Sequence, residues 1–182
     1  MAKNEKRGGL RGTMDKVTDT VGGMVGKAAA ATVGDARSFV ENAAIGDMYE
    51  MEAARIALQR SRSAPVLTLA QMMLEDHTTT THQMMSALRS SEVTRFHGAL
   101  TPPTELDARR KTMIDHLRDA PDADFDKRYL DQQQMAHSET ETLLRSYGEG
   151  GDNPQLQSVA RSALPMVQRH RAMAGRMQQE RL

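Results

Sequence analysis

The chain has 182 residues, with 24 basic and 24 acidic side chains and a formal net charge of zero. This length allows one domain with a sizeable hydrophobic core, and the neutral charge balance argues against nucleic-acid binding, which requires a basic surface. Because the chain contains no Cys, it has no disulfide, thiolate metal ligand or Cys nucleophile. The 14 Met are scattered over several segments, which indicates adaptable core filling rather than a copper site.

The first 34 residues differ in composition from the rest. Residues 1–16 are basic and polar, and residues 21–34 are rich in Gly and Ala. The weakly apolar part is too short to span a bilayer, and it follows a long polar stretch, which is not the order of a secretory signal. We therefore predict a flexible segment over residues 1–34, one folded domain over residues 35–182, and a cytoplasmic location.

The folded domain is predicted to be helical throughout. Apolar residues recur with the 3.6-residue period of a helix, helix-forming residue types dominate, and runs of β-branched residues are absent. Four long helices are expected, and a shorter one lies in the connection between the second and third. The long helices are predicted near residues 36–61, 65–89, 124–147 and 154–179, and the shorter one over residues 105–119.

The breaks between these helices predict how they are connected. Short breaks at residues 61–65 and 148–153 contain Pro or Gly, and short connections join antiparallel neighbours. Residues 90–104, which include a Gly and a Pro pair, are predicted to be a loop. This pattern predicts an all-α, ferritin-like antiparallel four-helix bundle with a long, helix-containing crossover.

Four polar side chains interrupt the apolar faces of the long helices, one from each helix. They are Glu50, His77, His137 and His170. A helix rises 1.5 Å per residue, so the distance of each side chain from its nearer short connection can be counted. All four lie roughly 20–25 Å from that connection, near the middle of their helices. Because an unpaired buried polar group is costly, we expect the four to converge, either as a site for one Zn, Fe or Mn ion or as a metal-free hydrogen-bonded network.

Other polar residues share these inner faces. Asp47, Tyr129 and Gln133 are candidates to orient the four groups through a second layer of hydrogen bonds. The duplicated Glu-x-x-His of carboxylate di-iron bundles is absent, since Leu74 and Val167 stand where the Glu would precede His77 and His170. An oxidase of that type therefore has too few carboxylate ligands.

Three stretches also carry a family resemblance: GDMYEMEAARIALQRSRSAPVLTLAQMMLEDHT, FDKRYLDQQQMAHSET and GDNPQLQSVARSALPMVQRH. In this order they resemble the bacterial domain-of-unknown-function family labelled "predicted outer membrane protein", which belongs to the ferritin-like superfamily. The resemblance covers about residues 38–177 and implies a ferritin-like bundle, with no established reaction to transfer. It also implies a periplasmic or cell-envelope location as the alternative to the cytoplasm.

The resemblance further implies which positions matter. The motif positions of the family correspond to Glu50, Asp76-His77, Phe125-Asp126, His137 and Leu164-Pro165 with His170. Asp76 therefore joins the candidates for the second layer around the site.

Three functions stay open at this stage. The first is a non-catalytic bundle that binds a metal ion, in stress or metal handling. The second is a structural or partner-binding bundle whose His/Glu cluster only fixes the packing, and the third is a metal-dependent oxidase or peroxide-handling enzyme. The sequence shows no Gly-x-Ser-x-Gly elbow, HExxH pair or phosphate-binding Gly loop. It identifies no protein partner, and it leaves a homo-oligomer open.

Overall fold

The computed structural model describes residues 2–180, with side chains from residue 13 onward, and all regular structure in this range is α-helical. The prediction of an all-α protein is confirmed. The helices in chain order are α1 (Ala2–Ala30), α2 (Ala36–Arg60), α3 (Ala64–Leu88), α4 (Ser91–His97), α5 (Ala108–Arg118), α6 (Asp122–Gly150) and α7 (Pro154–Gln179).

The four long helices predicted from the sequence are α2, α3, α6 and α7, and their ends agree with the prediction within three residues. Side-chain caps fix two of their starts. Asp35 accepts a hydrogen bond from the Ser38 backbone N–H at 2.9 Å at the start of α2, and Asn153 accepts one from the Leu156 N–H at 3.0 Å at the start of α7. These caps satisfy N–H groups that have no partner within the first helical turn.

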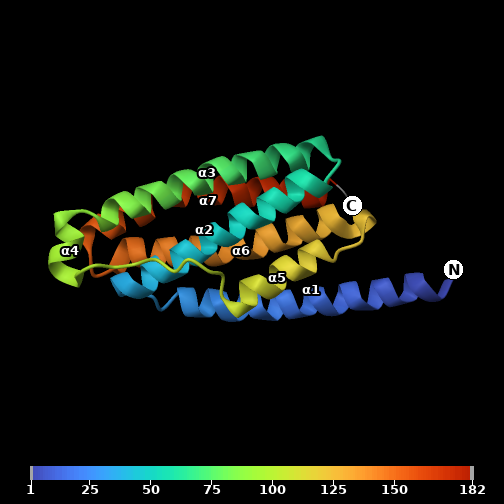
Figure 1. Ribbon diagram of the computed structural model, residues 1–182, viewed down its shortest axis with the longest axis horizontal. Coiled ribbons are helices and arrows are strands. Elements are labelled where there is room, and N and C mark those ends of the chain that lie inside the picture. The colour runs from blue at the N-terminus through green and yellow to red at the C-terminus, as the bar shows by residue number, and fades with distance from the viewer. Residues whose placement is uncertain (1, 181–182) are drawn as a thin grey trace.

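The four long helices pack side by side along the longest axis of the molecule (Figure 1). α2 packs against α3, and α6 against α7; α2 also contacts α6, and α3 contacts α7. Their inner faces bury two apolar clusters, one towards α5 around Tyr49 and Phe125 and one towards α4 around Phe39 and Leu156. Along α3, α6 and α7 the predicted His falls between the two clusters, and on α2 Glu50 directly follows Tyr49 of the first cluster.

The connection between α3 and α6 contains two helices rather than one. α5 corresponds to the predicted short helix, but α4 occupies part of residues 90–104, which were wrongly predicted to be a loop. The Ser90 hydroxyl caps α4 by accepting the Val93 N–H at 3.3 Å, and the Val93 side chain is buried. A helix of seven residues is too short to show a repeated apolar period, so only its cap and one buried residue specify it.

Residues 2–30 lie in helix α1, and the expected flexibility of residues 1–34 stays a prediction. α1 lies along α6 and touches α5 (Figure 1). Asp19 is buried in this contact, where its carboxylate lies 2.8 Å from His116 Nδ1 and accepts a hydrogen bond from Gln132 Nε2 at 2.9 Å. A Cβ added at Gly26 would lie 2.5 Å from the Glu139 carboxylate. This glycine therefore permits close approach of α1 to α6 rather than marking a flexible chain.

Candidate metal centre

Three histidine side chains from three different helices meet in the interior. His77 on α3, His137 on α6 and His170 on α7 are all buried. Their ring centroids lie 5.4 to 5.6 Å apart in each pair, and one ring nitrogen of each lies within 4.8 Å of one ring nitrogen of both others. The structure thus brings together three of the four residues that the sequence placed at one depth.

A carboxylate fixes the His77 ring from outside the cluster. His77 Nδ1 lies 2.8 Å from Asp47 Oδ1, and the hydroxyls of Thr80 and Thr81 donate to Asp47 Oδ2 at 3.0 Å each. A carboxylate only accepts hydrogen bonds, so the proton of the neutral ring belongs on Nδ1. The other nitrogen, Nε2, is then a lone-pair acceptor, and it is buried without a hydrogen-bond partner.

Acceptors fix the other two rings in the same way. His170 Nε2 lies 2.8 Å from Asp76 Oδ2, and His137 Nδ1 lies 2.9 Å from the Gln133 backbone carbonyl. Each of these nitrogens must therefore carry the ring proton. The remaining nitrogens, His137 Nε2 and His170 Nδ1, face each other at 3.4 Å. In the neutral rings both carry lone pairs, so neither donates to the other.

The environment shifts the pKa values of the three rings in different directions. Burial lowers the pKa of His77, but the hydrogen bond to Asp47 and the nearby carboxylates outweigh burial, so its pKa is raised overall. Burial lowers the pKa of His170 to about 4. Burial and the two neighbouring His rings hold the pKa of His137 well below its ordinary value. His137 and His170 are therefore neutral near pH 7, which is the form that binds metal.

The fourth predicted residue, Glu50 on α2, lies beside this group. Glu50 Oε1 is 3.3 Å from His137 Nδ1, but neither carboxylate oxygen has a hydrogen-bond partner. Burial raises the pKa of Glu50 to about 7, although the charge of His77 and the Gln133 side chain oppose the rise. The Tyr129 hydroxyl is also buried without a hydrogen-bond partner. A direct bond from Glu50 to a metal stays a prediction.

The donor set can be compared with metal geometry. A transition metal binds imidazole nitrogens at about 2.0–2.1 Å, and in a tetrahedral site two such nitrogens lie about 3.4 Å apart. The distance of 3.4 Å between His137 Nε2 and His170 Nδ1 agrees with this spacing. The hydrogen bonds to Asp47, Asp76 and the Gln133 carbonyl are the outer-layer contacts that usually orient metal-binding histidines. Imidazole nitrogens are ligands that suit Zn and Fe.

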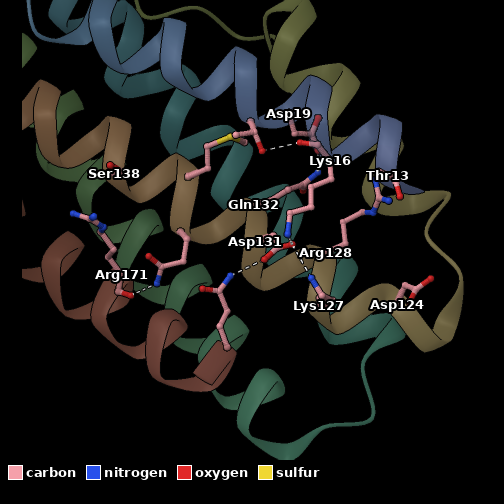
Figure 2. A pocket seen from close by; sticks show the side chains of 14 residues that line it. Thr13, Lys16, Asp19, Asp124, Lys127, Arg128, Asp131, Gln132, Ser138 and Arg171 are labelled. Atoms are coloured by element: carbon pink, nitrogen blue, oxygen red, sulfur yellow. Dashed lines mark hydrogen bonds and ion pairs between the residues drawn. The ribbon is translucent and has the colours of Figure 1, made fainter. Parts of the chain in front are cut away.

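A second candidate is the groove between α1, α6 and α7 shown in Figure 2. Its volume is about 630 Å³. The charged groups that line it already pair with one another: Lys16 and Lys127 contact Asp131 at 2.8 Å and 3.4 Å, and Arg171 contacts Glu141 at 2.7 Å. Most of the buried side-chain donors and acceptors without a hydrogen-bond partner lie instead around the histidines, so the histidine cluster is the stronger candidate.

Comparison with known proteins identifies the family. Residues 23–177 match the family described as Domain of unknown function (DUF4142), and since this is most of the chain, the protein belongs to that family. No curated protein and no solved structure matches the chain. Among the described residues, no helix has the length and apolar character needed to cross a membrane.

Proposed function

We propose that this member of the family is a ferritin-like four-helix bundle that binds one transition-metal ion through His77, His137 and His170, with Glu50 as a buried carboxylate beside the ion. In this proposal α4 and α5 form the long crossover of the bundle. The protein handles metal, in supply or stress protection, and catalyses no reaction of its own. Zn, Fe and Mn are the candidate ions, because imidazole and carboxylate donors suit them.

The observation that carries the proposal is the direction of the ring protons. When the three rings are neutral, each directs an N–H outwards to an oxygen acceptor and keeps a lone pair on its inner nitrogen. One nitrogen of each ring lies within 4.8 Å of one nitrogen of both others, and lone pairs that converge in this way repel one another unless a donor or a cation lies between them. A divalent cation satisfies all three nitrogens at once, and three carboxylates that raise the pKa of His77 (Asp47, Glu50 and Asp76) offset its charge.

The alternative is a metal-free polar network that only fixes the packing. Buried polar groups in native proteins nearly always have partners, and an isolated one costs about 1–3 kcal/mol. Here His77 Nε2, Glu50 Oε2 and the Tyr129 hydroxyl all lack one. A complete network would leave few such atoms, so this concentration favours a bound ion over a network.

The experiment is a metal titration of untagged protein, with elemental analysis of the protein as purified. Metal-free protein is mixed with Co²⁺, and binding is followed by the visible absorption of four-coordinate Co²⁺. We expect one ion per chain and loss of binding in His77→Ala. His82→Ala is the matched control, because His82 lies exposed on the same helix. A folded wild-type protein that binds neither Co²⁺ nor Zn²⁺ would show that the cluster is a packing network.

A further inference from the structure

The three groups that hold the histidine rings differ in their access to solvent. The carbonyl that holds His137 belongs to Gln133, which is fully buried. The Asp47 side chain is 15 % exposed and is bonded to two threonine hydroxyls as well as to His77. The Asp76 side chain is 31 % exposed, and its only partners among the described contacts are His170 and Arg169. Asp76 is therefore the most accessible polar group in direct contact with the cluster.

Arg169 and His170 compete for the same atom. Arg169 Nη2 and His170 Nε2 each lie 2.8 Å from Asp76 Oδ2. Arg169 is 55 % exposed, and pairs at such exposed positions are weak and readily displaced. The contact also joins neighbours in sequence: Asp76 precedes His77 on α3, and Arg169 precedes His170 on α7. The pair thus lies at the solvent side of the two helices that supply two of the three rings.

We propose that Asp76 is the carboxylate at which the metal ion of this centre arrives from solvent, and that Arg169 slows the arrival by occupying that carboxylate. The inference rests on the proposed metal-binding function and adds a route to it. A hydrated divalent cation binds the carboxylate in place of Arg169, because a carboxylate is the negative group that it meets first. Rotation of the His170 ring away from Asp76 then opens the way to the inner nitrogens. The guanidinium repels the incoming cation, so its removal speeds loading.

The route predicts an asymmetry between two carboxylates that play the same orienting role. Asp47 and Asp76 each hold one ring, so replacing either by Asn weakens metal binding by about 10–100-fold. Only Asp76 lies on the route. Asp76→Asn therefore also slows the association rate by about tenfold, whereas Asp47→Asn acts through faster release at an unchanged association rate. Arg169→Gln speeds association several-fold and leaves the equilibrium affinity within about twofold.

The test is stopped-flow mixing of metal-free full-length protein with Co²⁺, with association measured by visible absorption and release measured by transfer to a chelator. Wild type, Asp47→Asn, Asp76→Asn and Arg169→Gln are compared at low ionic strength. Arg171→Gln is the matched control, because Arg171 lies on the same helix and pairs with Glu141 instead. Its association rate should equal that of wild type. Circular dichroism confirms that each variant is folded.

Each outcome decides between the two proposals. If wild type takes up no Co²⁺, the metal centre and the route both fail. If wild type binds Co²⁺ but Asp47→Asn and Asp76→Asn slow association equally, or Arg169→Gln loads at the wild-type rate, the route is wrong and the metal centre stands. If Arg171→Gln speeds association as much as Arg169→Gln does, the faster loading is explained by the general charge of the surface. That result would also refute the route.

Discussion

Asp47→Asn tests the outer layer of the site through two separate quantities. In the native protein the carboxylate accepts three hydrogen bonds, from His77, Thr80 and Thr81, at 2.8 to 3.0 Å. A hydrogen bond to a charged group contributes about 1.5–3 kcal/mol and a neutral one about 0.5–1.5 kcal/mol, so each bond loses about 1 kcal/mol. The Asn oxygen can still accept from His77, and the side chain is partly exposed. We therefore expect metal-free Asp47→Asn to lose about 1–2 kcal/mol of unfolding free energy.

The second quantity is metal affinity. Without the carboxylate, the His77 ring is oriented less firmly and its inner nitrogen is a weaker base, so binding should weaken by about 10–100-fold, or about 1.4–2.7 kcal/mol. Urea unfolding in EDTA measures the first quantity, and competition with a metal-binding dye measures the second. Glu75→Gln, an exposed change on α3, is the control and should move neither by more than about 0.5 kcal/mol. Unchanged affinity in a variant that binds metal would refute the assigned orienting role of Asp47.

Three further predictions concern stability. Glu139→Gln should lower the free energy of urea unfolding by about 2–4 kcal/mol, because the half-buried guanidinium groups of α5 lose their carboxylate partner. Glu141→Gln, whose ion pairs are more exposed, is the control and should lower it by at most about 1 kcal/mol. Asp35→Ala should cost about 1 kcal/mol at pH 7. The Ser38 backbone N–H lowers the pKa of Asp35 below 3.8, so its stabilisation is complete above that value and is lost as pH falls through the lower, folded-state pKa; a cost that persists undiminished at pH 2 would contradict this. Removal of residues 1–34 should leave one cooperative melting transition by circular dichroism at a lower midpoint, since Gln132 and His116 lose Asp19; non-cooperative melting would show that residues 35–182 are not an independent domain.

The packing of the N-terminal helix could not be read from the sequence. Its Gly and Ala content is typical of a flexible chain, and its outward side chains include Met14, Val17 and Val21, so no core-facing apolar stripe was visible. The contact of α1 with the rest of the protein instead uses a buried carboxylate, Asp19, and close approach at Gly26. Polar and glycine contacts have no period that identifies them before the partner helix is placed, so the sequence could not show this packing.

The outer layer of the candidate metal centre was partly visible in the sequence. Asp47 and Asp76 were candidates, and they contact His77 and His170. Thr80 and Thr81 were not among the candidates, yet both donate to Asp47. Their position one turn after His77 was the available signal. Arg169 gave none, because its contact with Asp76 depends on how α7 sits against α3.

The sequence by itself determined the four long helices, their inner faces and the depth of the polar groups along each helix. These properties depend on local propensity, the 3.6-residue period and a fixed rise per residue, all of which act within one segment. The tertiary structure alone decided which nitrogens face one another. It placed the inner nitrogens of His137 and His170 at 3.4 Å and set Glu50 against the outer nitrogen of His137. Such distances depend on the rotation and spacing of neighbouring helices, which follow from how whole side chains interdigitate and which no single segment encodes.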